Sequence, residues 1–460
     1  MKDANHIYKR LVVTHDFAGR LLCIIIQLFL FSFSLFSQDK ASYPTSNNYS
    51  TDKDIQPVLQ AAIDSAKDGD QIILPAGHFY VGKTIVITKF ISLKGQGSRK
   101  TILYQSASTP DSILRQRDHN NIIRYDINKE IPSNIVISDI GFRSKRPMVV
   151  SGDGGSTAKT SGITLNRCVD FVIERCRFDY FGNSGISVRH QDTLARGLIR
   201  NNEFYYNAGD GLGYGVTVYG SNNQWVSDPK FGSANFIFVE DNIFDFHRHS
   251  IAANSGSLFV FRHNKVFNNI AASGGHAIDV HEARQSPYGS RAMEVYNNLL
   301  INTTYTDSTP IVKGVWKSHS GGVLESAGIA IRNGDAIVYN NELKGYACAV
   351  AMSNWYWGRT VQPYPMPYSP GYLSGKQLGA NHSGTDAESI RGDAFIWNNT
   401  NDPFSESKND TATLFQNSQP DWWKEGRDYH FEAMPGYKPY PYPYPVTYKV
   451  TGSVINLKFD

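Results

Sequence analysis

Apolar and polar positions along the chain change from a helical period to a period of two near residue 70. A single apolar stripe at helical spacing comes first, formed by Ile55, Val58, Leu59, Ala62, Ile63 and Ala66. It predicts an amphipathic helix that has Asp54 as its N-cap and ends at Asp68-Gly69-Asp70. Three short runs follow at 71–74, 80–88 and 90–94, and they predict β-strands.

From about residue 135 a strand motif recurs, in which an apolar strand is followed by asparagine, one further residue and an apolar residue. The asparagine-equivalent positions are Cys176, Asn202, Asn242, Asn264, Asn298, Asn341 and Asn399. The shortest separation, between Asn242 and Asn264, is 22 residues. This length fits one solenoid coil, and longer separations fit a coil with loop insertions on one face. Stacked asparagines can form hydrogen-bonded ladders, so Cys176 is expected to be a buried structural cysteine.

A second series of short strands lies between these motifs, at 185–188, 215–218, 250–253, 277–280, 328–331 and 347–350. Two or three short strands per coil, stacked in parallel, account for both series, because each coil then buries its apolar side chains against its neighbours. The sequence therefore predicts an all-β fold, a parallel solenoid with loop insertions, over residues 54–400.

Several motifs of the first coils resemble the pectin-lyase-like superfamily: Asp68 to Gly77, 84–87 and 93–97. The resemblance implies a single-stranded right-handed parallel β-helix with an N-terminal capping helix, and an activity on polysaccharides. The chain lacks the paired aspartates of the polygalacturonase branch and the Trp-Ile-Asp-His of the calcium pectate lyase branch. Residues 248–252 and 276–281 are instead similar to a poorly characterised branch of exported bacterial β-helix proteins.

Composition and charge exclude several other classes of protein. Of the 460 residues, 13% are aromatic and 19% are charged, which argues against general disorder and against a coiled coil. The net charge of +3 is too balanced for a dedicated nucleic-acid binder, so no nucleic-acid partner is expected. We expect a monomer whose partner is a polysaccharide substrate.

The two ends of the chain carry their own signals. Arg20, the apolar run 21–36 and Ser37 predict a signal peptide over 1–37, followed by a flexible leader over 38–53. The apolar run is shorter than the roughly 20 residues that span a bilayer, so we expect cleavage, no remaining membrane span, and a secreted, periplasmic or cell-surface protein. Proline-rich and tyrosine-rich residues 401–460 predict a strap that packs on the solenoid.

Outward-facing residues of the second strand series point to a functional surface. Because side chains alternate along a strand, one outward column is Ser187, Thr217, Ala252, Asp279, Ala330 and Ala349, and the next is Arg189, Tyr219, Asn254, His281, Arg332 and Ala351. His249 and His276 just precede the corresponding strands. The candidate catalytic residues are His249, His276, Asp279, His281 and Arg248. The candidate substrate-binding residues are Arg189, Tyr214, Tyr219, Arg332, Trp355 and Trp357. The alternative is that these polar side chains only solvate a β-sheet.

Two reaction classes fit this surface. A lyase needs a base that removes the C5 proton of a uronate and a cation that neutralises its carboxylate. His249 or His276 suits the role of base, and Tyr214 or Tyr219 could act as the acid. A hydrolase needs two carboxylates, and Asp279 would require Glu282, Asp210 or Glu325. The abundance of histidine favours elimination, while a non-catalytic carbohydrate-binding or adhesion protein is a further alternative. No metal or other cofactor is expected. The alternatives are a metal held by His249, His276 and Asp279, which lack a short helical metal motif, and calcium bound by Asp153, Asp210 and backbone carbonyls.

Overall fold

In the described part of the computed structural model, one helix precedes the first β-strand. That part comprises residues 54–105, 120–126, 135–144, 160–191, 193–207, 212–221, 224, 228–267, 276–281, 289–302, 327–332, 334–352, 393–402, 413–417, 424–446, 448 and 450–458, with only the backbone described in 120–126. The predicted signal peptide and leader lie outside these residues. No helix within them is long and apolar enough to cross a membrane.

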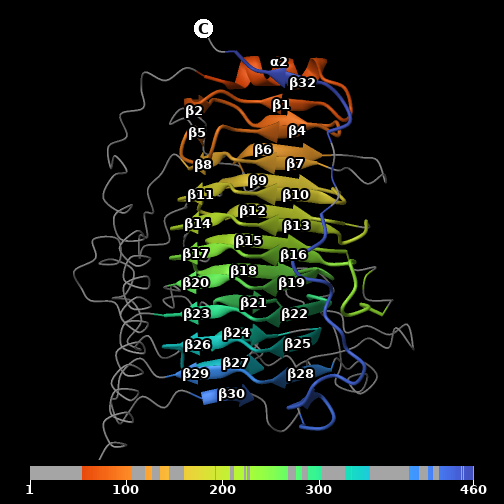
Figure 1. The fold of residues 1–460 in the computed structure, drawn as a ribbon. Coiled ribbons are helices and arrows are strands. Elements are labelled where there is room, and N and C mark those ends of the chain that lie inside the picture. The colour runs from red at the N-terminus through yellow and green to blue at the C-terminus, as the bar shows by residue number, and fades with distance from the viewer. Residues whose placement is uncertain are drawn as a thin grey trace, which may run out of the picture. The chain divides into compact units, whose positions relative to one another are not determined.

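The helix α2 (Gln56–Ser65) caps the first coil, as Figure 1 shows. Leu59 and Ile63 are buried on its inner face, as the apolar stripe predicts. The predicted N-cap is off by one residue, because Ile55 occupies that position and no side chain caps the helix. Asp54 instead forms an isolated parallel bridge with Tyr80, and its carboxylate accepts hydrogen bonds from the backbone N–H groups of Gln56 and Gly82.

Three long parallel sheets form the rest of the solenoid (Figure 1). The first sheet contains β31 (Tyr429–His430), β28 (Ala394–Trp397), β25 (Asp335–Tyr339), β22 (Ala292–Tyr296), β19 (Leu258–Arg262), β16 (Ile237–Glu240), β13 (Gly197–Arg200), β10 (Phe171–Glu174), β7 (Val136–Ser138), β4 (Ser92–Lys94), β1 (Gln71–Ile73) and β32 (Val454–Asn456). The second contains β2 (Gly77–Val81), β5 (Thr101–Gln105), β8 (Gly141–Arg143), β11 (Arg177–Asp179), β14 (Glu203–Tyr205), β17 (Ile243–Asp245), β20 (Lys265–Phe267), β23 (Leu299–Ile301), β26 (Glu342–Lys344) and β29 (Thr400–Asp402).

The third sheet contains β3 (Ile85–Ile87), β6 (Asn120–Asp126), β9 (Thr160–Asn166), β12 (Ser184–Arg189), β15 (Tyr214–Tyr219), β18 (His249–Asn254), β21 (Ile278–Val280), β24 (Ala327–Ile331), β27 (Cys348–Met352) and β30 (Thr413–Asn417). In every sheet the neighbour of a strand is the equivalent strand of the next coil, three strands further along the chain, except where β32 joins β1. This order confirms the predicted parallel β-helix. The strand β30 adds a coil beyond residue 400, where the sequence placed the end of the solenoid.

The asparagine ladder runs between the first and second sheets. In each rung an asparagine Oδ1 accepts the backbone N–H of the equivalent residue one coil earlier, beginning with Asn202 and Cys176 at 2.9 Å. Asn242, Asn264, Asn298, Asn341 and Asn399 continue the pattern. Cys176 thus occupies the first ladder position, and burial raises the pKa of its thiol to about 12. A thiol with this pKa is protonated and unreactive at neutral pH.

The register of the third sheet agrees with the predicted outward column as far as Ala330. Asp279 pairs with Ala252 on one side and with Ala330 on the other. The next coil is shifted by two residues, since Ala330 pairs with Ala351 and not with Ala349. A slip of two residues keeps every side chain on the same face. Because residues 347–351 are mostly small, the sequence pattern did not distinguish the observed register from the predicted one.

The C-terminal segment connects both ends of the first sheet. β31 pairs with β28 at one end, and β32 pairs with β1 at the other. Between them the chain lies along the coils (Figure 1), with Met434, Tyr437, Tyr440 and Tyr444 packed against the core. We call residues 434–446 the strap. It covers the outer face of the first sheet, away from the strands of the third.

His247 is a buried scaffold histidine that makes stability depend on pH. Its ring nitrogens lie 3.2 Å and 3.1 Å from the carbonyl oxygens of Asn207 and Phe204. Burial lowers the pKa of His247 from the usual 6.5 to about 4. As the pH falls from 6.5 to about 4, the unfolded chain therefore takes up a proton that the folded chain does not. The stability that depends on neutral His247 is complete above this window and is lost as the pH falls through it.

Replacing His247 by glutamine should flatten this dependence, because glutamine does not titrate and its amide can still donate to a carbonyl. We expect wild type to lose about 3 kcal/mol more unfolding free energy across the window than His247→Gln loses. Urea unfolding over a pH series measures the difference. Parallel curves for the two proteins would show that His247 is not the titrating group.

Candidate functional site

The structure brings four of the predicted site residues into contact on the outer side of the third sheet. His249 begins β18, Asp279 is the middle residue of β21, and His281 follows it. Arg332 comes directly after β24 and reaches Asp279. We call His249, Asp279, His281 and Arg332 the Asp279 cluster. Trp355 and Trp357 lie outside the described residues.

Strand alternation and small neighbours explain why a carboxylate fits at this position. Ile278 and Val280 are in the core, so Asp279 between them points outward. Its neighbours on the adjacent coils are Ala252 and Ala330. Their methyl groups leave room above and below the carboxylate, and longer side chains fill that room. Asp279 is consequently 0% exposed although it faces away from the core.

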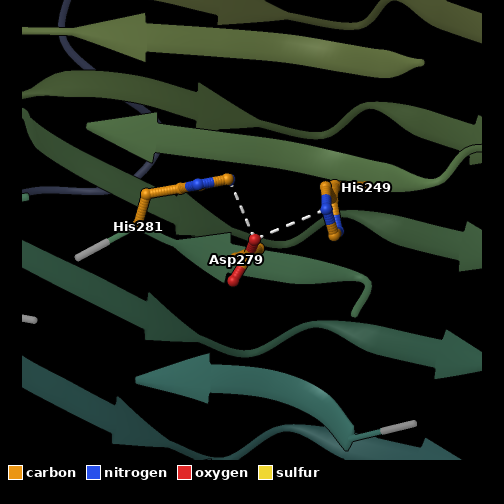
Figure 2. A group of neighbouring side chains, drawn as sticks. All are labelled: His249, Asp279 and His281. Carbon is orange, nitrogen blue, oxygen red and sulfur yellow. Dashed lines mark ion pairs between the residues drawn. The ribbon is translucent and has the colours of Figure 1, made fainter. Parts of the chain in front are cut away.

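Three cationic or imidazole groups converge on the Asp279 carboxylate. The guanidinium Nη1 of Arg332 donates to Oδ1 and Oδ2 at 3.0 Å and 2.9 Å. The Nε2 atoms of His281 and His249 lie 3.0 Å and 3.4 Å from Oδ2. Figure 2 shows the two rings approaching the carboxylate from different sides. His281 is the more accessible of the two, with 26% of its side chain exposed against 0% for His249.

The electrostatics of the cluster keep Asp279 ionised. Burial alone would raise the pKa of Asp279, but the charge of Arg332, together with the neighbouring imidazoles, holds it well below its usual value. An ionised carboxylate paired with a guanidinium cannot serve as a general acid near neutral pH. Asp279 therefore orients its neighbours and supplies negative charge.

A stack of rings crosses three coils beside the cluster. The centroids of Tyr214 and His249 are 5.4 Å apart, and those of His249 and His276 are 6.4 Å apart. Burial raises the pKa of Tyr214 to about 12, and its hydroxyl accepts a hydrogen bond from Arg248 at 3.0 Å. Burial lowers the pKa of His276. At neutral pH the stack thus carries a protonated phenol on one side of His249 and an unprotonated imidazole on the other.

Hydrogen bonds to carbonyl groups define the tautomers of both histidines. The Nδ1 atom of His249 lies 2.6 Å from the carbonyl oxygen of His276, and Nδ1 of His276 lies 3.3 Å from that of Ala327. A carbonyl can only accept, so each Nδ1 carries the proton and, in the neutral ring, each Nε2 carries a lone pair. Burial lowers the pKa of His249 well below its usual value.

The remaining predicted residues lie on the preceding coils. Arg189 and Tyr219 are register partners on β12 and β15, and the guanidinium carbon lies 5.3 Å from the centre of the tyrosine ring. Beside them, Ser187 and Thr217 carry buried hydroxyl groups that find no hydrogen-bond partner in the part of the chain that the structure describes. The sequence placed Ser187 and Thr217 in an outward column but gave no sign that they are buried. Arg332, which the sequence predicted to bind the substrate, donates hydrogen bonds to Asp279, a contact that the sequence did not indicate.

A family model described as rhamnogalacturonase A/epimerase, pectate lyase-like, matches residues 49–298, which is more than half of the chain. No curated protein sequence matches the chain.

Solved structures with a similar course of the chain have low sequence identity. The ORF18 protein of Geobacillus virus E2 is 11% identical, with 82% of this chain and 58% of that protein covered and a TM-score of 0.45. An alginate lyase from Paenibacillus sp. str. FPU-7 is 13% identical, with coverages of 79% and 96% and a TM-score of 0.40. The A-module of a mannuronan C-5 epimerase from Azotobacter vinelandii is 12% identical, with coverages of 88% and 95% and a TM-score of 0.38.

Proposed function

The chain belongs to the rhamnogalacturonase A/epimerase, pectate lyase-like family, and on that premise we propose that it cleaves an acidic, uronate-containing polysaccharide by β-elimination at His276, beside the Asp279 cluster. One observation carries the proposal: the partly exposed His276 presents an Nε2 proton acceptor near the guanidinium groups of Arg332 and Arg248. We also propose that the protein acts outside the cytoplasm after removal of residues 1–37.

His276 is the base in this proposal. Elimination begins when a base removes the C5 proton of a uronate, next to its carboxylate. The Nε2 atom of His276 carries a lone pair because Nδ1 donates to the carbonyl of Ala327. Its lowered pKa keeps the ring in the basic form at neutral pH. His276 is also only partly buried, so a substrate can reach it more easily than it can reach His249.

Tyr214 lies two coils from His276, with His249 between them, so it does not act on the same sugar bond, and positive charge near it instead favours a neighbouring uronate. Its pKa of about 12 keeps the phenol protonated at neutral pH, and the leaving oxygen of the sugar takes its proton from water. Arg248 donates to the same hydroxyl, and its charge favours a uronate carboxylate nearby. Cationic groups that neutralise this carboxylate stabilise the enolate that forms when the C5 proton leaves.

Hydrolysis is less well supported by the same residues. It requires one carboxyl group that is protonated and a second carboxylate on the other side of the bond. Asp279 is held ionised by Arg332 and cannot be the acid. The partners that the sequence offered, Glu282, Asp210 and Glu325, lie outside the described residues.

The proposal is tested by incubating the purified protein with polygalacturonate, alginate and, as a control, a neutral glucan. β-Elimination yields an unsaturated uronate that absorbs in the ultraviolet, together with new reducing ends. We expect both signals with at least one acidic polymer and neither with the glucan. New reducing ends without ultraviolet absorbance would identify a hydrolase, and binding without either signal would favour the adhesion alternative.

A further inference from the structure

The Nε2 atom of His249 faces a carboxylate oxygen of Asp279. This atom is buried and has no hydrogen-bond partner among the described residues, although Oδ2 of Asp279 lies 3.4 Å away. The proton of the ring is on Nδ1, which donates to the carbonyl of His276. A lone pair and a carboxylate oxygen repel each other at this distance, and burial strengthens the repulsion. A cation between these two atoms would turn the repulsion into attraction.

We propose that His249, Asp279 and His281 bind one divalent first-row transition metal ion. An ion about 2.1 Å from each ligand atom requires ligand atoms about 3.0 to 3.4 Å apart for octahedral or tetrahedral angles. The two distances to Asp279 Oδ2 are 3.0 Å from His281 and 3.4 Å from His249. All three ligand atoms lie within 4.8 Å of one another, so small rotations of the rings bring them onto a common centre.

The surroundings of the three ligands support a metal site. Histidine ligands usually donate their second ring N–H to a carbonyl or carboxylate, which fixes the tautomer and the ring orientation. His249 makes this hydrogen bond with the carbonyl of His276. Asp279 is oriented by Arg332, and the small neighbours Ala252 and Ala330 leave space around its carboxylate. His249 and Asp279 are therefore each held in place by a contact that metal binding does not break.

The ligand set selects the class of metal. Two imidazole nitrogens and one carboxylate oxygen suit zinc, cobalt, iron or nickel, whereas calcium prefers six to eight oxygen ligands. Three protein ligands leave coordination positions open for a substrate oxygen. The charge of Arg332 beside Asp279 weakens cation binding but makes the occupied site attractive to an anionic substrate. Binding of the metal does not depend on the proposed elimination, but a role in neutralising the uronate carboxylate does rest on that proposal.

Metal binding is tested on full-length protein purified without a histidine tag and freed of metal with a chelator. Titration with Co²⁺, followed by visible absorption, reports nitrogen and oxygen ligation, and calorimetry with Zn²⁺ gives stoichiometry and affinity. We expect one ion per chain, and a rise in the melting temperature of wild type with Zn²⁺. His249→Asn keeps an amide that can donate to the His276 carbonyl but loses the Nε2 ligand, and should bind at least tenfold more weakly.

His281→Ala should show the same loss, and His78→Ala, which removes an exposed histidine of the second sheet, serves as the matched control. The proposal is overturned if metal-free wild type takes up no ion, because a proton on His249 then supplies the cation. It is also overturned if His249→Asn and His281→Ala both bind like wild type. One bound ion without elimination of any acidic polymer would refute the proposed function alone, and elimination by a protein that binds no ion would refute the metal alone.

Discussion

Replacing His276 by alanine is expected to lower kcat on the acidic substrate by about 10²–10⁴-fold, the usual contribution of a general base. The Nε2 lone pair of His276 is the proton acceptor in the proposed elimination, and alanine offers none. KM should change little, because the base acts on the proton in the transition state and adds little to substrate binding. Initial rates from the ultraviolet absorbance of the unsaturated product, measured over a range of substrate concentrations, separate the two constants.

A loss of activity is meaningful only if the solenoid stays intact. His276 precedes β21 and contributes one side-chain hydrogen bond, to the carbonyl of Ala327, so the unfolding free energy should fall by about 1 kcal/mol. His263→Ala is a matched control, since this ring stacks on Tyr442 of the strap and lies far along the coil from the ring stack. It should retain wild-type kcat. Undiminished kcat in His276→Ala would remove His276 from the role of base.

The fold could be predicted because the solenoid repeats a local rule. Each coil carries its own alternating strands and its own ladder residue, and residues just before the ladder positions adopt positive φ, as Asn201, Asp241 and Asn297 do. The sequence pattern of a single coil is therefore enough to identify the fold, and the repetition of this pattern gives the order of the strands. The exception is β27, where a run of small residues allowed a register two residues away from the observed one.

The candidate site was predictable in position but not in its contacts. Alternation indicates that Asp279 and His281 point outward and that His249 begins the neighbouring coil. Burial of Asp279 depends on side chains that fill the space beside Ala252 and Ala330, and the pairing with Arg332 depends on the rotamer of a long side chain. Neither this burial nor this pairing follows from a repeating pattern in the sequence. The tautomer of His249, which the metal proposal uses, follows from one backbone carbonyl that no sequence pattern reveals.

The largest loss of stability is expected from Arg262→Met, at the contact between the first sheet and the strap. Arg262 is fully buried, and its Nε donates to Glu240 at 2.8 Å. Its Nη1 and Nη2 donate to the strap carbonyls of Tyr440 and Pro441 at 2.7 Å and 2.9 Å. Methionine fills much of the volume but leaves Glu240 buried without this ion pair. Breaking a buried pair in this way costs about 3 to 5 kcal/mol.

Arg200→Met is the matched control for this substitution, because Arg200 and Arg262 flank Glu240 in the same register column. Arg200 pairs with Glu174 at 2.8 Å, but 23% of its side chain is exposed and no strap carbonyl depends on it. Glu174 is itself buried, but it keeps an ion pair with Arg175, so loss of the partly exposed Arg200 should cost only about 1 kcal/mol. Urea unfolding should therefore separate the two variants by at least about 2 kcal/mol, with faster proteolysis of 434–446 in Arg262→Met alone. Equal losses would mean that the strap is held by its packed tyrosines rather than by Arg262.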